Sequence, residues 1–386
     1  MIRYLTAGES HGPALAGIIE GMPANLPVDV EKVNHELYRR QQGFGRGGRM
    51  KLETDRIEVL SGIRFKKTLG SPVSFILRNK DWQNWTEVMA QEEGASGKEI
   101  TRPRPGHADL SGALKYHFED MRNVLERSSA RETAMRVAVG GFVKQLLAYF
   151  GIQIFSHVLQ IGSVKAKFTA IQEIIKTDEI NKLADQSPVR CLDSKAEKAM
   201  MELISKTKSA GDTVGGIIQI IIRHVPPGLG SYVHWDRKLD ARLAAALMSI
   251  QAVKGVEVGI GFKGAELAGS QFHDEMFFDK DSIVRRRNNA GGIEGGMSNG
   301  EDIVLQIMMK PIPTLMKPLH SVDVKTKKAY MAHKERSDVT AVPACSVIAE
   351  AVVAPVIANA FMEKFGSDTV DDMMEALTAY KQRIQL

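Results

Sequence analysis

Short matches at one constant offset constrain the fold of this 386-residue chain more than any other feature. In each of the two regions that they mark, the hydrophobic pattern predicts a strand, a helix and a strand in the same order. Because several matches share one register, we predict an internal duplication of a sheet-and-helix unit, with halves at about 1–150 and 211–330. Two such halves packed together form a layered α+β architecture. The matches at an offset of 199 residues are Gly17-Ile18-Ile19 with Gly216-Ile217-Ile218, Glu58-Val59 with Glu257-Val258, Gly62 with Gly261, and Gly70-Ser71 with Gly269-Ser270.

Capping residues and hydrophobic periodicity predict the individual elements. Asp29 can cap a helix that ends at Gly43, and Ser129 with Glu132 has the spacing of a capping box. A C-terminal helical part is expected over about 344–386, with a kink at Pro355. The predicted strands are 14–19, 57–60, 73–77, 217–222, 256–262 and 303–309; the predicted helices are 30–42, 131–149, 236–253, 344–365 and 370–382, with peripheral helices in 165–210 and a long irregular segment at 80–106.

Composition excludes several classes of protein. Only two cysteines, Cys191 and Cys345, are present, so we expect neither a disulfide scaffold nor a CxxC metal or redox site. No apolar run reaches the roughly 18 residues of a membrane helix, and the N-terminus lacks a secretory signal, so we expect a cytoplasmic protein without membrane contact. The net charge of +5 could suit nucleic acid, but aromatic residues make up only 6% and do not alternate with the basic clusters.

The arginines gather instead beside glycines and prolines, where they suit a grip on phosphate or carboxylate or, alternatively, a solvated surface. The stretch 43–48 has the spacing G-x-G-x-x-G, but a predicted helix precedes it and a strand follows, so it is not a dinucleotide-binding turn. What remains is a glycine loop with Arg46 and Arg49, which favours anion binding over a simple turn.

Two histidines lie in turns that contain glycine and proline. His11 is found in Gly8-Glu9-Ser10-His11-Gly12, and His107 in Arg104-Pro105-Gly106-His107-Ala108-Asp109, where Asp109 could orient the imidazole. Histidine is the natural proton donor near neutral pH, although either residue could equally lie in an ordinary core or surface turn.

Four further stretches carry polar chemistry. Glu126 to Arg131 lies at a helix N-terminus, which is a ready anion site as well as a cap. The glycine-dense stretch 288–300 could wrap a planar ligand or form a flexible loop; 310–314 adds a lysine and a rigid turn, and Asp338 beside Arg336 is a candidate base. No zinc-protease, P-loop or nucleophile-elbow motif is present. The residues alone therefore predict an enzyme for a small, multiply anionic substrate.

Taken together, these stretches resemble the chorismate synthase family almost from end to end, and the segment at 80–100 resembles its longer bacterial form. The resemblance is carried by GESHGPALAGIIEGMP, RRQQGFGRGGRM, RPGHADLSG, ERSSARETA, NNAGGIEGGMSNG, KPIPT and ERSDVTAVPA. It implies a carbon–oxygen lyase of aromatic amino acid biosynthesis, which removes phosphate from 5-enolpyruvylshikimate 3-phosphate by a 1,4-anti elimination to form chorismate. It also implies a need for reduced FMN without net redox change.

The resemblance assigns roles to residues of this chain. His11 would donate to the reduced flavin, His107 would act as general acid near the departing phosphate, and Asp338 would assist flavin N5 in taking the ring proton. The substrate anions would be held by Arg49, Arg104, Arg131 and Arg336. FMN would lie against Arg127, Ser128, Ser129, Gln251, Ala252, Gly296, Lys310, Pro311, Ile312, Pro313, Thr314 and Arg336, and Arg40 and Arg46 match positions of NADP contact.

The resemblance further implies a single domain over 1–386, a β-α-β sandwich with an internal repeat, and a cytoplasmic homotetramer. NADPH or an external flavin reductase would reduce the flavin. The remaining alternative is a different phosphate-handling flavoenzyme, which would share the FMN-binding loops but would not need both histidine motifs.

Overall fold

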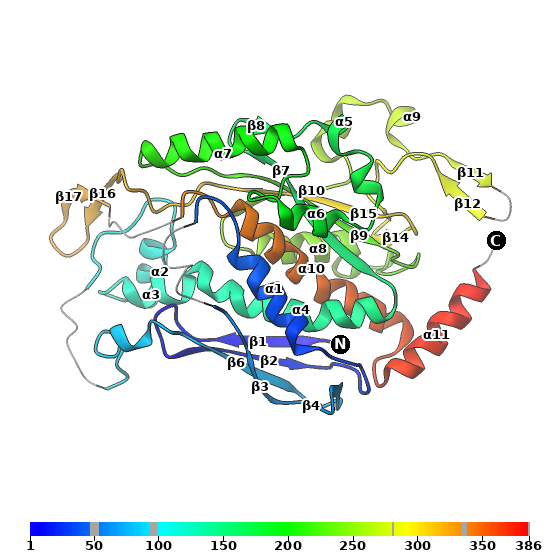
Figure 1. Ribbon diagram of the computed structural model, residues 1–386, viewed down its shortest axis with the longest axis horizontal. Helices are drawn as coiled ribbons and strands as arrows, with labels where there is room; N and C mark the ends of the chain where they lie inside the picture. The colour runs from blue at the N-terminus through cyan, green and yellow to red at the C-terminus, as the bar shows by residue number, and fades with distance from the viewer. Residues whose placement is uncertain (47–53, 93–98, 280–281, 333–337, 385–386) are drawn as a thin grey trace.

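Two antiparallel sheets enclose a layer of helices in the computed structural model, which describes residues 1–46, 54–92, 99–279, 282–332 and 338–384 (Figure 1). The first sheet has the strand order β1-β2-β6-β3. Its strands alternate as expected for a half-buried sheet: Leu15 and Ile19 face the helices and are buried, whereas Ile18 is exposed. The strands are β1 (Arg3–Ala7), β2 (Ala14–Glu20), β3 (Glu58–Ser61) and β6 (Val73–Arg78).

The second sheet has five strands in the order β10-β15-β9-β7-β8, and every pair in it is antiparallel. Its central strand β9 is rich in isoleucine because both of its faces are covered. The strands are β7 (Gln153–Ile161), β8 (Val164–Lys165), β9 (Gly216–Arg223), β10 (Val253–Val258) and β15 (Ile303–Met309).

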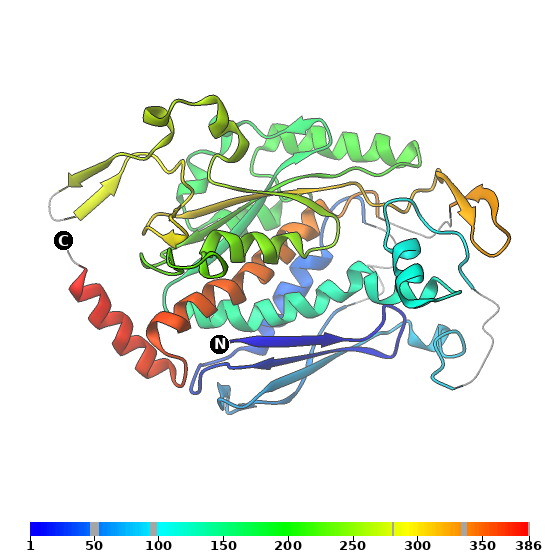
Figure 2. The same ribbon diagram turned by 180° about the vertical axis from the view of Figure 1, so that it is seen from behind.

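Four helices fill the space between the sheets, and Figure 2 shows three of them, α4, α8 and α10, side by side. Helix α10 is apolar almost all round because it packs on α4, α1, α8, β7 and β9. By length and composition it could cross a membrane, which corrects the expectation that no apolar run is long enough, but 89% of the relevant window is buried inside the protein. The four helices are α1 (Val30–Gln41), α4 (Thr133–Tyr149), α8 (Leu239–Met248) and α10 (Val342–Phe365).

The remaining elements lie around this sandwich. Helices α5, α6 and α7 lie on the outer side of the second sheet, α11 follows α10, and α2 and α3 pack together at one end of the molecule (Figure 1). The helices are α2 (Asp109–Tyr116), α3 (Arg122–Ser128), α5 (Phe168–Ile171), α6 (Ile180–Gln186), α7 (Ser194–Ser209), α9 (Gly269–Phe272) and α11 (Val370–Arg383). Four small hairpins are formed by β4 (Ile63–Arg64) and β5 (Lys67–Thr68), β11 (Met276–Asp279) and β12 (Ser282–Arg285), β13 (Ile293–Glu294) and β14 (Met297–Ser298), and β16 (His320–Asp323) and β17 (Lys328–Met331).

The main elements follow one another in the same order in both parts of the chain. The sequence β1-β2-α1-β3-β6-α4 corresponds to β7-β9-α8-β10-β15-α10, and the strand order within the two sheets corresponds as well. The predicted second half, 211–330, therefore leaves out β7, which pairs with β9 in the second sheet. The C-terminal part predicted to be helical over about 344–386 contains α10, which belongs to the middle layer, and α11.

Two predicted elements differ from the structure because of backbone conformation. The helix expected over 236–253 spans only Leu239–Met248, since Lys238 is extended and Ala252 has a φ of +69°. The strand expected over 256–262 ends at Val258, because Gly259 and Gly261 have positive φ and a 3-10 helix, Gly261–Glu266, follows.

His157 on β7 should make the stability of the protein depend on pH. Its side chain is completely buried beside Gln219, with 2.9 Å between Nε2 and Oε1, and burial lowers its pKa to about 4. An unfolded histidine titrates near 6.5, so between these values the unfolded state binds more protons and stability falls as the pH falls. We expect a loss of about 2 kcal/mol between pH 7 and pH 5. Urea unfolding at both pH values should show this loss, and His157→Gln should abolish most of it; an equal loss in the variant would contradict the assignment.

Candidate active site

The predicted site residues that the structure describes lie, with one exception, at one end of the helical layer. Figure 1 shows α4 and α10 both beginning on the side where α2 and α3 lie. Arg40 at the end of α1 donates from Nε to Oγ1 of Thr133, the first residue of α4, at 3.0 Å. Helix N-termini carry partial positive charge, so this end of the layer favours anions.

His11 lies in the turn between β1 and β2. Gly8 opens this turn with a φ of +106°, and a Cβ there would come within 2.5 Å of the carbonyl oxygen of Ala14. The Nδ1 of His11 lies 2.9 and 3.0 Å from the two carboxylate oxygens of Glu126, and its backbone N–H donates to Oε2 of Glu126 at 2.9 Å. The imidazole is therefore fixed through Nδ1 by a buried carboxylate.

His107 is fixed in the same way. Its Nδ1 lies 2.6 Å from Oδ1 of Asp109, the first residue of α2, as the sequence predicted. Arg104 donates to Oδ2 of Asp109 from Nε at 2.8 Å and to Oγ1 of Thr314 from Nη1 at 3.0 Å. Burial would raise the pKa of Asp109, but the hydrogen bonds from His107 and Arg104 outweigh it and hold the pKa well below its usual range.

Arg131 is a buried residue at the start of α4. It donates from Nη1 to both oxygens of Asp55 at 2.8 and 2.7 Å, and from Nε and Nη2 to Oδ1 of Asn79 at 3.2 and 3.0 Å. The amide nitrogen of Asn79 in turn donates to the carbonyl oxygen of Gly12 at 2.6 Å, which ties the arginine to the turn that carries His11. Arg131 and Arg104 thus both have internal carboxylate partners.

Asp338 lies beside Arg46, with 3.0 Å between Oδ2 and Nε. The backbone N–H of the next residue, Val339, donates to the carbonyl oxygen of Gly45 at 2.9 Å, so the glycine loop is joined to the segment before α10. The carbonyl oxygen of Val339 accepts the N–H of Val214, and the neighbouring Thr213 hydroxyl donates to the carbonyl oxygen of Ile312. Asp338 is therefore connected to the predicted cofactor segment 310–314.

Several of the predicted flavin-binding residues form one connected strip. Arg127 donates from Nη2 to the carbonyl oxygen and hydroxyl of Thr6 at 2.7 and 2.8 Å. The Thr6 hydroxyl donates to Oε1 of Glu132, and Nε2 of Gln251 donates to Oε2 of Glu132, both at 3.1 Å. Glu132 thus joins Arg127 to Gln251 across the start of α4.

The strip continues from Gln251 to the segment 310–314. The backbone N–H of Lys310 donates to the carbonyl oxygen of Ala252 at 2.9 Å, and its ammonium group donates to the carbonyl oxygen of Gly106, beside His107. Pro313 lies against the same turn, because a Cβ on Gly106 would meet its side chain at 3.6 Å. The side chain of Ser129 accepts the N–H of Arg131 and donates to Ser10; that of Ser128 donates weakly to Leu125.

Comparisons with known proteins identify the family to which this chain belongs. The family model described as chorismate synthase matches residues 2–362. The chain belongs to the chorismate synthase family. The chorismate synthase of Alkaliphilus metalliredigens is 57% identical over 383 residues, covering 98% of this chain and 99% of the relative. That of Pelobacter propionicus is 56% identical over 395 residues, covering all of both chains. A crystal structure of chorismate synthase matches with a TM-score of 0.80 at 40% identity, covering 100% of this chain and 98% of that one.

Membership of the chorismate synthase family confirms the resemblance read from the motifs and the α+β class of the fold. It makes the chain an enzyme of the shikimate pathway that acts on a small-molecule substrate.

Gly296 is the one described residue among the predicted flavin contacts that lies apart from the others. Its carbonyl oxygen accepts the N–H of Leu239 at 2.9 Å at the start of α8, whereas Gln251 follows the end of that helix. Ten helical residues separate these positions by about 15 Å. Arg49 and Arg336 lie outside the described residues. Arg40 is buried, and it donates to Thr133 and to the carbonyl oxygen of Ala130, so it holds the start of α4.

Sequence analysis identified Asp109 as a partner of His107 but missed the partners of His11 and Arg131. Glu126 was noted as part of a helix N-terminus, but its contact with His11 spans 115 residues. Asp55 and Asn79, which hold Arg131, lie 76 and 52 residues from it and were not singled out. Their only sequence signal is position, since each lies two residues from the end of a predicted strand of the first sheet.

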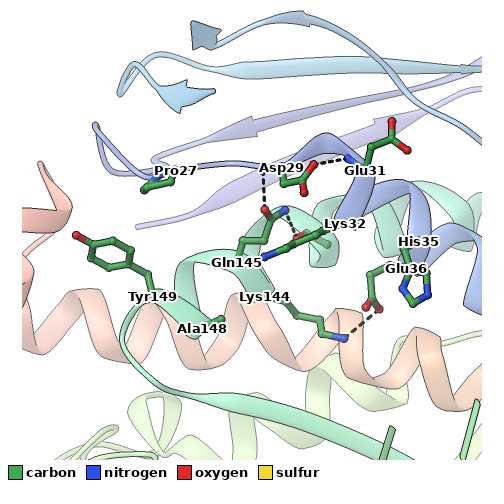
Figure 3. A pocket seen from close by; sticks show the side chains of 11 residues that line it. Pro27, Asp29, Glu31, Lys32, His35, Glu36, Lys144, Gln145, Ala148 and Tyr149 are labelled. Atoms are coloured by element: carbon green, nitrogen blue, oxygen red, sulfur yellow. Dashed lines mark hydrogen bonds and ion pairs between the residues drawn. The ribbon is translucent and has the colours of Figure 1, made fainter. Parts of the chain in front are cut away.

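A cavity of about 640 Å³ lies between α1 and α4, outside this site (Figure 3). Its wall includes Asp29, Lys32, Tyr149, Glu36 and Lys144, and the last two form an ion pair of 3.0 Å. No residue predicted for catalysis or binding lines it. The concave surface between the two helices is therefore not the candidate active site.

Proposed function

We propose that this enzyme converts 5-enolpyruvylshikimate 3-phosphate to chorismate by a 1,4-anti elimination that requires reduced FMN without net redox change. The carrying observation is that two histidines, each fixed through Nδ1 by a buried carboxylate, lie at the same end of the fold as Arg104, Arg131 and the described flavin-binding residues other than Gly296. In this reaction the bond between carbon and the phosphate oxygen breaks and phosphate leaves with the electron pair. A ring C–H bond breaks, its electrons complete the new double bonds, and the proton passes to a base.

The hydrogen bonds of the two histidines support roles in proton transfer. Because Nδ1 of each imidazole faces a carboxylate, we assign the donated proton to Nδ1 and proton exchange to Nε2. Arg104 also lies beside the ring of His107, with its Nη2 3.0 Å from Nδ1 and 3.4 Å from Nε2. His107 would protonate the departing phosphate, and Lys310 beside it adds a positive charge. His11 would donate to the cofactor and hold its protonation state, and Asp338 would help to take the ring proton.

A buried acceptor atom on Gln251 supports the proposal that FMN binds here. Oε1 of Gln251 is buried and accepts no hydrogen bond among the described residues, although its amide nitrogen is engaged by Glu132. A flavin ring offers an N–H donor that suits such an acceptor, so the strip fits the group, except at Gly296. When bound, reduced FMN would supply electron density that helps to expel phosphate. The residues that would hold it are Arg127, Ser128, Ser129, Gln251, Ala252, Lys310, Pro311, Ile312, Pro313, Thr314 and Arg336.

The substrate carries two carboxylates and a phosphate, which suits arginine. Arg49 and Arg336 are proposed as direct contacts. Arg104 and Arg131, whose guanidinium groups also bind Asp109 and Asp55, are proposed to hold the substrate anions with them. We further propose that Arg40 and Arg46 contact NADP and that NADPH or an external reductase reduces the flavin. The enzyme is proposed to be a homotetramer located in the cytoplasm. The matching order of elements in the two halves supports the internal duplication.

An anaerobic assay tests this function. The protein is mixed with 5-enolpyruvylshikimate 3-phosphate and chemically reduced FMN, and phosphate and chorismate absorbance are followed. We expect turnover that stops with oxidised FMN; addition of NADPH to oxidised FMN then reports whether the enzyme reduces its own flavin. Absence of turnover in folded, flavin-binding protein would favour a different phosphate-handling flavoenzyme.

A further inference from the structure

The imidazole of His11 belongs to a closed cycle of four side chains that contact one another. The members are His11, Glu126, Arg122 and Trp85, and each contacts the next. His11 and Glu126 are 11% and 2% exposed, so the contact between them is shielded from water. The cycle joins the turn after β1, helix α3 and the segment 81–89, which are distant in the sequence.

Glu126 controls the edge of the imidazole. One carboxylate binds both Nδ1 and the backbone N–H of His11, so the side chain and main chain of the histidine are held by the same group. An ionised carboxylate only accepts hydrogen bonds, which requires that Nδ1 carry the proton. Arg122 donates to Oε1 of Glu126 at 3.2 Å and keeps the carboxylate in place from the preceding turn of α3.

Trp85 controls the face of the imidazole. Its ring centroid lies 3.8 Å from that of His11 with an interplanar angle of 27°, which is a stacked arrangement. The indole is itself fixed, because its N–H donates to Oδ2 of Asp81 at 2.9 Å and the guanidinium of Arg122 lies 5.3 Å from the ring centroid. The carboxylate of Glu126 therefore restricts the direction of the imidazole, and the indole of Trp85 restricts its tilt.

We propose that Glu126 and Trp85 are positioning residues for His11: the carboxylate sets the tautomer and direction of the imidazole, and the indole sets its tilt. The inference rests on the proposed function for the role of His11 in catalysis. A group that exchanges a proton with a bound cofactor must be aligned within a fraction of an ångström, and small misplacements cost up to about 10²-fold in rate. Both residues act through the histidine and need not touch substrate.

A double-mutant cycle tests this proposal. Glu126→Gln and Trp85→Ala should each lower kcat about 10–100-fold, with KM changed by less than about threefold. In a His11→Ala background, either change should have almost no further effect on kcat, because the group on which they act is absent. Exposed Glu87, in the segment that carries Trp85, supplies the matched control Glu87→Gln.

Fluorescence supplies a readout that does not depend on turnover. Trp82→Phe and Trp235→Phe leave Trp85 as the sole tryptophan of the three. Contact with an imidazole quenches indole emission, so His11→Ala should raise the emission of Trp85 in the ligand-free protein. Glu126→Gln should raise it as well, since the imidazole is then released from its edge contact, whereas Glu87→Gln should leave it unchanged.

The possible results distinguish the positioning role of Glu126 and Trp85 from the proposed function of the enzyme. If His11→Ala lowers kcat but Glu126→Gln and Trp85→Ala lower it further in that background, the positioning role is overturned while the function stands. If His11→Ala leaves turnover unchanged, the role of His11 falls, and the positioning role in catalysis with it. Because Glu126→Gln removes the charge partner of Arg122, its fold is checked by circular dichroism, and Trp85→Ala serves as a second variant that strands no charge.

Discussion

Replacing His107 with alanine is expected to lower kcat about 10²–10⁴-fold, which is the range for loss of a general acid. The imidazole is 17% exposed, its Nδ1 is held by Asp109 at 2.6 Å, and Lys310 reaches the carbonyl oxygen of the residue before it. In the proposed reaction, a donor held in this way would protonate the departing phosphate at little entropic cost. The measurement is steady-state phosphate release under anaerobic conditions with reduced FMN.

His117, at the other end of the same helix α2, offers a matched control. It is exposed and has a φ of +55°, a conformation that asparagine tolerates, so His117→Asn should leave kcat within about twofold. A His107→Ala enzyme that keeps full activity would contradict the general-acid role. Activity lost equally in both variants would instead indicate that α2 as a whole had been disturbed.

Elements whose signals are local could be predicted from the sequence. The strand 303–309 has the predicted limits, and helix α1 begins where Asp29 accepts the N–H of Glu31. These features depend on residues a few positions apart, such as a cap or an alternating run. The capping box at Ser129 is only half formed, because Glu132 pairs with Arg136, Thr6 and Gln251 instead of its own cap. Tertiary partners there outweigh the local bond.

The contacts of the predicted site residues could not be predicted from the sequence. Arg104 and Arg131, which are predicted to bind substrate anions, are each buried against a carboxylate that sequence spacing did not assign as a charge partner. A buried guanidinium must be paired, and the partner is chosen by the packing of strands and helices rather than by distance along the chain. Long-range pairs such as Glu126 with His11 therefore required the structure.

Glu350→Ala is expected to have the largest effect on stability, about 3–5 kcal/mol. Glu350 lies in the middle of α10 and is completely buried. It accepts hydrogen bonds from Arg39 at 2.9 and 3.0 Å, from Lys144 at 2.6 Å and from the hydroxyl of Ser156 at 2.6 Å, and Arg190 lies at 3.4 Å. These residues join α1, α4 and β7 to α10. Without the carboxylate, three cations would remain in the helical layer with too few anions to balance them.

The pH dependence distinguishes this electrostatic cause from a simple packing defect. Burial would raise the pKa of Glu350, but Arg39 and Lys144 hold it well below its usual range, so the wild-type carboxylate stays ionised until the pH falls through that lowered value. Burial and Arg39 already lower the pKa of Arg190 to about 9, and Glu350 opposes that shift. Without Glu350 the pKa of Arg190 should lie lower still in the folded protein than in the unfolded chain, so the stability of the variant should rise with pH. Urea unfolding from pH 6 to pH 9 should therefore show that the stability deficit of Glu350→Ala becomes smaller.

Glu363→Ala, which breaks the partly exposed pair with Arg242, should cost only about 0–1 kcal/mol at every pH. A deficit for Glu350→Ala that does not change with pH would assign the loss to the cavity alone.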